Sequence, residues 1–225
     1  MTDNNRQCSD LEKCPFELDI IKLKEEIKQL SELVSTDVLT GLFNYRHFLT
    51  ALAQEMERSQ RTGQPTVLIM ADADYFKKVN DNWGHEVGNQ ALKLIANAIT
   101  QNIRKLDIAC RYGGEEFAII LPSTGMATAN QVSERIRKTI EETPLIIPSK
   151  DGDITLDLTI SIGFSLYSGD LNDNSNKLIE RADQQLYRAK QSGRNRVCHD
   201  ETELGNQQVD DDEKSALFGM FSDKE

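Results

Sequence analysis

Acidic residues occur at two predicted turns of the chain. A continuous apolar run, Thr66–Met70, predicts a buried strand, and Asp72 follows it closely. A Gly-rich β-hairpin is predicted further on, and its tip carries Glu115 and Glu116. Carboxylates at such turns can bind a hard cation such as Mg²⁺, which proteins commonly hold with one or two carboxylates plus substrate phosphates. From the residues alone, solvated turn carboxylates are the commoner alternative.

Four blocks around these acids point to one family. They occur in the order Asp37-Val38-Leu39-Thr40-Gly41-Leu42-Phe43-Asn44-Tyr45-Arg46; Asp72-Ala73-Asp74-Tyr75-Phe76-Lys77-Lys78-Val79-Asn80-Asp81 with Gly84-His85 and Gly88; Arg111-Tyr112-Gly113-Gly114-Glu115-Glu116-Phe117; and Leu186-Tyr187-Arg188-Ala189-Lys190 with Gly193-Arg194-Asn195. One short block is a weak signal, but four in order are highly specific. The chain resembles the GGDEF family of diguanylate cyclases, in its GGEEF variant, from about Thr36 to Cys198.

The resemblance implies an enzyme that condenses two GTP into cyclic di-GMP and two pyrophosphates. Asp72, Glu115 and Glu116 are the implied catalytic residues. Asp72 and Glu115 would hold two Mg²⁺ ions (Mn²⁺ is an alternative), with the Ala73 carbonyl as a further ligand. Glu116 would assist the metals or act on the attacking 3′-hydroxyl. In such chemistry the metals activate the 3′-hydroxyl and stabilise charge on the α-phosphate and the departing pyrophosphate.

The resemblance also implies a GTP-binding set. Asn80 would hydrogen-bond the guanine, while Lys190 and Arg194 would neutralise the triphosphate. Asp74, Asp81 and His85 are interpreted as structural. The implied GTP-binding residues are Phe76, Lys77, Asn80, Asn89, Gly113, Gly114, Lys190 and Arg194. The two glycines have a physical reason, because a backbone without Cβ can pass close to a nucleotide.

Asn89 departs from the family pattern, which usually has Asp at this position. Guanine offers two donors on the edge concerned, and Asn has one acceptor oxygen and one donor group. One hypothesis is therefore weaker GTP affinity or relaxed selectivity against ATP. The alternative is that Asn80 alone suffices for guanine recognition.

A regulatory site is also implied. Arg104-Lys105-Leu106-Asp107 matches the family's RxxD product-inhibition motif, and Arg135 is placed like the second arginine of that site. Arg can bind phosphate or guanine bidentately, and Asp can accept from guanine N–H groups. Cyclic di-GMP would then be both product and inhibitor. The alternative is a surface ion pair at a helix end.

The N-terminal part has heptad spacing. Apolar residues recur at intervals of four and three, at Phe16, Ile20, Leu23, Ile27, Leu30 and Val34. This pattern favours a short parallel coiled coil over an amphipathic helix packed on its own domain. Because each domain of the family binds one GTP and two must face each other, a homodimer is expected.

The remaining elements alternate between helix and strand, which implies an α/β sandwich. The resemblance specifies an α/β (α+β) fold with a central, mostly antiparallel sheet flanked by helices, of the nucleotide-cyclase or palm type, preceded by the coiled-coil helix. Predicted helices are Asn44–Arg61, Glu86–Arg104, Ala127–Glu142 and Lys177–Gln191. Predicted strands are Thr66–Met70, Ile108–Tyr112, Phe117–Leu121, and one or two within Ile154–Tyr167. The predicted divisions are a flexible arm (1–15), the coiled coil (16–35), the catalytic domain (36–198) and an acidic, disordered tail (199–225).

Composition limits the partners. The net charge is −11, which disfavours nucleic acid, and no apolar run suits a membrane span or signal peptide. We therefore expect a cytoplasmic protein. Cys110 is interpreted as core, and Cys8 and Cys14 as unrelated thiols rather than a metal or redox sensor. In the tail, Ala216–Phe221 is either a docking peptide or a loosely packed end.

Two classes of function compete with an active cyclase. One is a catalytically silent module that binds GTP or cyclic di-GMP, against which the intact acids argue. The other is a scaffold that acts through the coiled coil and tail. A cyclase that also makes cyclic GMP–AMP is the alternative within the enzyme class.

Overall fold

The computed structural model describes residues 20–24, 35–148 and 152–200. Contacts within the chain divide it into two units at Ser35. Of the first unit, residues 20–24 are helical and exposed, and the rest of the heptad segment lies outside the described residues. The arm, the tail and the coiled coil therefore stay predictions.

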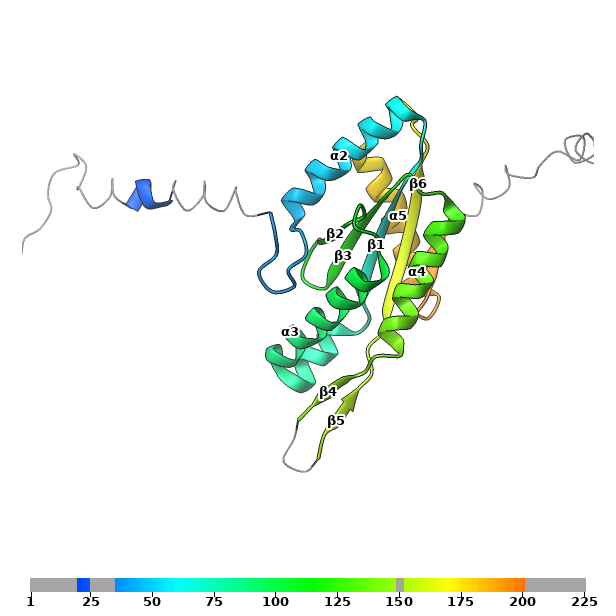
Figure 1. The fold of residues 1–225 in the computed structure, drawn as a ribbon. Coiled ribbons are helices and arrows are strands. Elements are labelled where there is room, and N and C mark those ends of the chain that lie inside the picture. The colour runs from blue at the N-terminus through cyan, green and yellow to red at the C-terminus, as the bar shows by residue number, and fades with distance from the viewer. Residues whose placement is uncertain (1–19, 25–34, 149–151, 201–225) are drawn as a thin grey trace, which may run out of the picture. The chain divides into compact units, whose positions relative to one another are not determined.

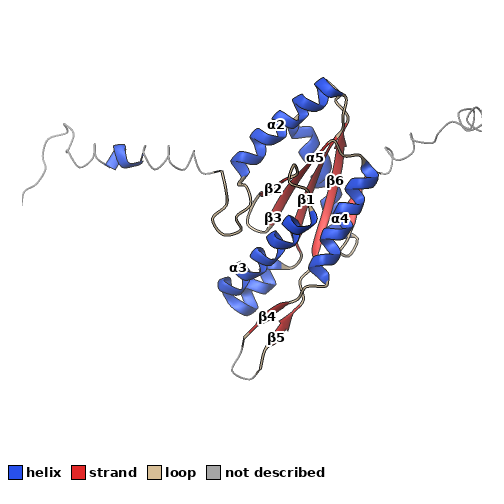
Figure 2. Cartoon of the chain, viewed as in Figure 1, coloured by secondary structure: helices blue, strands red, loops and turns tan. Residues whose placement is uncertain are grey.

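The second unit is built on a five-stranded sheet in the order β2-β3-β1-β6-β7 (Figures 1 and 2). The strands are β1 (Thr66–Ala73), β2 (Ile108–Arg111), β3 (Glu116–Pro122), β6 (Ile160–Tyr167) and β7 (Val197–His199). Every pairing is antiparallel except that of β6 with β7. The prediction of a central, mostly antiparallel sheet flanked by helices is confirmed.

Helices cover both faces of the sheet. These are α2 (Tyr45–Thr62), α3 (Phe76–Asn102), α4 (Met126–Glu141) and α5 (Ser175–Gln191). Side chains alternate along β1, so Leu68 and Met70 pack with residues of α2 and α5, while Val67, Ile69 and Ala71 pack with α3 and α4. Every residue of β1 is buried for this reason. Cys110, predicted to be core, is also buried.

Two elements were not predicted. They are β4 (Leu145–Ile147) and β7, each three residues long. β4 pairs with β5 (Ile154–Leu156) in a separate two-stranded hairpin. The predicted strand region 154–167 therefore contains two strands, β5 and β6.

The longest helix also begins earlier than predicted. The sequence pattern indicated a helix only from Glu86, whereas α3 starts at Phe76 and is interrupted at Gly84, which has φ 80° and ψ 166°. A glycine is suited to this point, because other residues rarely adopt positive φ. The helical turns before Gly84 contain Phe76, Lys77 and Asn80, which are predicted GTP-binding residues.

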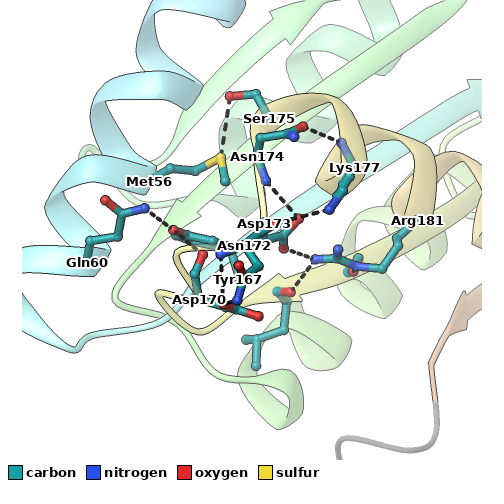
Figure 3. Close-up of polar contacts among 12 residues, drawn as sticks. Met56, Gln60, Tyr167, Asp170, Asn172, Asp173, Asn174, Ser175, Lys177 and Arg181 are labelled. Atoms are coloured by element: carbon teal, nitrogen blue, oxygen red, sulfur yellow. Dashed lines mark hydrogen bonds and ion pairs between the residues drawn. The ribbon is translucent and has the colours of Figure 1, made fainter.

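Polar contacts at the end of β6 fix the start of α5 (Figure 3). Asn174 caps the helix by accepting from the Lys177 backbone N–H at 3.1 Å. Arg181 pairs with Asp173 at 2.7 Å. Tyr167 of β6 accepts a hydrogen bond from Gln60 of α2 at 2.7 Å, and the Ser175 hydroxyl at the start of α5 donates to Met56 Sδ of α2 at 3.4 Å, which joins the two helices on this face. α5 is thereby oriented at one end, and its other end carries Lys190.

Candidate active site

The predicted catalytic acids come together where β1 and β3 lie side by side. Asp72 is the cross-strand partner of Glu116. The Ala73 backbone N–H donates to the Glu115 carbonyl at 3.1 Å, which continues the pairing into the hairpin. Asp72 is 9% exposed, and Glu115 and Glu116 are half-buried. The structure therefore brings Asp72, Ala73 and both glutamates into one cluster.

This cluster carries more negative charge than its surroundings balance. Burial raises the pKa of Asp72 above its usual value, while the nearby Lys190 ammonium opposes that shift. Burial also raises the pKa of Glu116, and the charge of Asp72 adds to the effect. Lys190 Nζ lies 2.8 Å from Asp72 Oδ2, so a cation already contacts this carboxylate. The site favours positively charged ligands.

The donor set fits a hard divalent cation that is shared with a substrate. In the predicted ligand set, Asp72 and Glu115 would supply carboxylates, and Ala73 would supply a backbone carbonyl. Within the described ranges, no group of three or more His, Cys, Asp or Glu side chains is arranged to hold a metal ion by itself. Mg²⁺ is commonly held by one or two carboxylates and completed by substrate phosphates and water. The excess negative charge and the sparse carboxylate set both agree with that mode.

Arg111 organises the hairpin that carries the glutamates. Its guanidinium donates to the Gly114 carbonyl at 2.8 and 3.2 Å and pairs with Asp37 at 3.2 Å. The hairpin closes where the backbone N–H groups of Tyr112 and Gly113 both donate to the Glu116 carbonyl. Arg111 thus joins the hairpin tip to the loop that contains Asp37.

Asp37 is a site-supporting residue to which the sequence assigned no role. Its carboxylate accepts from the Thr40 backbone and hydroxyl at 2.9 and 2.6 Å, and also from Arg111. Burial by itself would raise the pKa of Asp37, but these hydrogen bonds and the Arg111 charge outweigh it and lower that pKa. The sequence signal for this role was the position of Asp37 at the start of the first motif, because a charged residue beside a turn often has an ion-pair partner.

The absence of a side chain at Gly113 has a local structural reason. A Cβ at this position would lie 2.6 Å from Glu116 Oε2. Gly114 is exposed, and a Cβ there would meet open space. Gly113 therefore leaves room for the Glu116 carboxylate, which adds to the nucleotide-approach argument drawn from the sequence.

The interruption of α3 brings the predicted guanine-binding residues together. A Cβ on Gly88 would lie 2.0 Å from Asn80 Oδ1 and 3.2 Å from Phe76 Cζ. The chain thus folds back after Gly84, and Asn89 follows directly on the residue that contacts Asn80. Asn80 and Asn89 are both half-buried, and Lys77 is exposed. The structure places Phe76, Asn80 and Asn89 in one region.

The loop after α5 lies against the start of α3. Arg194 has φ 64° and stacks on Tyr75, with its guanidinium carbon 4.5 Å from the ring centroid. Asp74 accepts from the hydroxyls of Thr159 and Ser161 at 2.8 and 2.6 Å and from the Asn195 backbone at 3.0 Å. These contacts agree with the structural interpretation of Asp74. Asp81 and His85 are exposed, so their structural role stays a prediction.

The three predicted regulatory residues meet at the end of α3. Asp107 accepts from the Arg104 backbone N–H at 2.7 Å, and the Arg135 guanidinium donates to the Asn102 carbonyl. Burial raises the pKa of Asp107, while the charges of Arg104 and Arg135 oppose the shift. Both arginines are exposed. The two arginines form a cationic surface. They belong to other segments of the chain, and to other elements of the fold, than the catalytic acids.

Comparison with known proteins agrees with the geometry. Residues 34–196 match the family model described as "Diguanylate cyclase, GGDEF domain". The chain belongs to the GGDEF family. This confirms the predicted family, while the roles of individual residues remain proposals.

Curated relatives extend beyond the matched region. The chain is 40% identical over 175 residues to the response regulator PleD of Caulobacter vibrioides, covering 78% of this chain and 38% of that protein. It is 36% identical over 200 residues to diguanylate cyclase A of Treponema denticola, covering 87% of this chain and 53% of the relative. The chain thus spans about 38% and 53% of the lengths of these two relatives.

Solved structures support the fold assignment. The coiled coil and GGDEF domain of DgcB from Caulobacter crescentus, in complex with c-di-GMP, is 30% identical with a TM-score of 0.70, over 83% of this chain and 96% of that chain. The active GGEEF domain of a diguanylate cyclase from Vibrio cholerae is 32% identical with a TM-score of 0.62, over 69% and 96%. Separately, none of the helices in the described part of the chain has the length and apolar character needed to span a membrane.

Proposed function

We propose that the GGDEF domain of this chain is a diguanylate cyclase, which condenses two GTP molecules into cyclic di-GMP and two pyrophosphates. The proposal rests on one observation. Asp72, Glu115 and Glu116 lie together where β1 and β3 pair, and Lys190 contacts Asp72. Membership of the GGDEF family supports the same reaction.

The substrate would bind between the catalytic acids and the first turns of α3. Asn80 and Asn89 would hydrogen-bond the guanine, next to the small Gly88. Phe76 and Lys77 would approach the phosphates, the former through its backbone N–H at the start of a helix. Lys190, Arg194 and the backbone of Gly113 and Gly114 would complete the triphosphate site.

In the chemical step, the 3′-hydroxyl of one GTP attacks the α-phosphate of the other. A new 3′–5′ phosphodiester bond forms, the bond to pyrophosphate breaks, and the hydroxyl proton is lost. Glu116 is the group proposed to hold or accept that proton, because burial and Asp72 both raise its pKa. Lys190 would turn from Asp72 to the developing negative charge on the phosphates. A second, equivalent reaction closes the ring.

Asp72, the Ala73 carbonyl and Glu115 would hold the divalent ions, for which we infer Mg²⁺ with Mn²⁺ as a substitute. When bound, such ions would supply charge stabilisation at the phosphates and would lower the pKa of the attacking hydroxyl.

Turnover would require a homodimer, because each domain binds one GTP and the two substrates must react with each other. Cyclic di-GMP would inhibit by binding at Arg104, Asp107 and Arg135. The support is that these residues are exposed or half-buried and lie together at the end of α3.

Asn89 supports a second candidate, a cyclase that also accepts ATP and makes cyclic GMP–AMP. Asn offers one acceptor and one donor, which matches the donor and acceptor of the adenine edge, whereas guanine presents two donors there. The chain would then retain Asn80 as its main guanine contact.

A turnover assay tests these proposals together. Purified protein is incubated with Mg²⁺ and GTP, with and without ATP, and the products are separated by chromatography. We expect cyclic di-GMP from the wild type and none from Glu115→Ala. Pure cyclic di-GMP from mixed nucleotides would remove the second candidate. Absence of product from dimeric protein that carries no bound cyclic di-GMP would favour a silent binding module.

A further inference from the structure

A cavity of about 320 Å³ lies beside β2, at one edge of the sheet. Its apolar lining comes from Leu42, Phe43, Ile103 and Ala109, and its charged lining consists of two cations, Arg104 and Lys105, and one acid, Asp107. Its size is at the lower end of the range for ligand pockets. It is therefore large enough for one or two apolar side chains of a peptide.

The surroundings of this cavity are both apolar and basic. Leu106 is 81% exposed, between the lining residues Lys105 and Asp107. Val38 is 96% exposed, on the loop that supplies Leu42. Arg104 and Lys105 are exposed as well. Together with the apolar lining of the pocket, these side chains extend the apolar area available to a partner. The two cations outnumber the lining acid Asp107 and favour an acidic partner.

The chain itself contains a segment of matching chemistry. Residues 201–225 include eight acidic and two basic residues, and four consecutive acids occupy Asp210–Glu213. Three residues later, Ala216–Phe221 is an apolar hexapeptide. Both segments lie outside the described residues. We propose that Asp210–Phe221 docks at this cavity, with its apolar side chains against Leu42, Phe43 and Ile103 and its acids against Arg104 and Lys105.

The connecting chain is long enough for this contact. The described part ends at Asp200, after β7, whereas the cavity lies beside β2. These strands are the opposite edges of the sheet, and four strand spacings of ~4.8 Å separate them by roughly 19 Å. The seventeen residues from Asp200 to Leu217 can span about 55 Å when extended, which leaves room to pass around the domain.

Docking would have a regulatory consequence, which rests on the proposed function. Arg104 lines the cavity and is also a proposed ligand of the inhibitory cyclic di-GMP. The acidic segment and the cyclic dinucleotide would compete for this cation. The docked segment would then raise the concentration of product needed for inhibition.

Photo-crosslinking of the full-length chain tests the docking itself. The photoreactive residue p-benzoylphenylalanine replaces Phe218, and crosslinked peptides are identified by mass spectrometry. A mixture of ¹⁵N-labelled and unlabelled protein separates crosslinks within one chain from those between chains. We expect crosslinks within one chain to 36–43 or 100–109. The readout needs no cyclase activity, so failure of docking and failure of the proposed function are distinguishable.

Matched variants test the two kinds of contact. The double variant Arg104→Glu, Lys105→Glu reverses both positive charges of the cavity lining. It should lower the crosslink yield about fivefold, as expected for the loss and reversal of two exposed ion pairs. Leu217→Asp should lower it comparably, whereas Arg61→Glu, at the far end of α2, should not. Crosslinks only between chains, crosslinks to other segments, or a yield unchanged by these variants would overturn the proposal.

Discussion

Lys190 Nζ lies 2.8 Å from Asp72 Oδ2, so the last turn of α5 supplies a cation to the carboxylate at the end of β1. The ion pair is largely shielded from water, with 29% and 12% of the two side chains exposed. Asp72 faces Glu116 across the strands, and of the two cations that lower its pKa, Lys190 contributes more than Arg194. In the proposed reaction the same ammonium would move to the triphosphate.

Lys190→Met removes this charge while keeping much of the side-chain volume. We expect kcat/KM for GTP to fall by about 10²-fold, because a preorganised cation at the developing charge is lost. Lys177→Met is the matched control, since Lys177 lies at the start of the same helix and contacts the Asn172 carbonyl. Initial rates of product formation for both variants check this prediction. Equal losses would show that α5 is merely destabilised.

Asp37→Asn should weaken the support of the hairpin through Arg111. The pKa of Asp37 is lowered in the folded state, so the carboxylate stabilises the fold above its unfolded pKa, near 3.8, and this contribution disappears as pH falls toward the folded value. We expect a loss on the order of 1–2 kcal/mol at pH 6, typical of hydrogen bonds to a charged group. The difference from wild type should shrink below pH 3.8.

Urea unfolding at pH 6 and pH 3 measures this effect, with the exposed Asp157→Asn as control. A difference that stays constant between the two pH values would contradict the assignment of stability to the ionised Asp37 carboxylate.

Gly88→Ala should affect substrate binding more than folding. The added Cβ would meet Asn80 Oδ1 at 2.0 Å and Phe76 Cζ at 3.2 Å. Asn80 can rotate away because the contact is with the end of its side chain, and Phe76 needs to shift by only a few tenths of an ångström. We expect KM for GTP to rise roughly tenfold, the equivalent of about one hydrogen bond. Gly125→Ala, where a Cβ meets open space, should leave KM unchanged. An unchanged KM in Gly88→Ala would contradict the placement of Asn80 at the guanine.

Gly163→Ala should affect folding instead. A Cβ there would lie 1.9 Å from the Leu186 backbone nitrogen and 2.6 Å from the Ala182 carbonyl oxygen, so α5 itself would have to move away from β6. Overpacking of this kind costs about 1–3 kcal/mol or more. Thermal melting beside Gly125→Ala tests the prediction, and equal melting temperatures would contradict the close packing of α5 on β6.

Much of this architecture could be predicted from the sequence, because the deciding signals are local. The apolar run of β1 and the Gly-rich hairpin each indicate their own structure, and four motifs in order specify the family. β4 and β7 were missed because three-residue strands carry too little pattern. The first turns of α3 were missed because Gly84 interrupts the helical periodicity.

Contacts between distant segments could not be predicted. Arg111 and Asp37 are 74 residues apart, and their ion pair depends on how the first loop lies against the hairpin. The fit of Gly163 to α5 likewise depends on a close approach of two backbones. Such contacts arise from tertiary packing, and the spacing of residues in a single sequence does not predict them.

Asp72 and Asp74 are near neighbours with different proposed roles, Asp72 in catalysis and Asp74 in supporting the fold. The most direct measurement compares cyclic di-GMP formation at saturating GTP and Mg²⁺ by Asp72→Asn and Asp74→Asn, together with their melting temperatures. We expect Asp72→Asn to lose at least about 10²-fold in rate while remaining folded. Asp74→Asn should melt at a lower temperature and keep its rate within about tenfold, because its partners are Thr159, Ser161 and Asn195. A folded Asp72→Asn protein with the wild-type rate would show that Asp72 takes no part in catalysis.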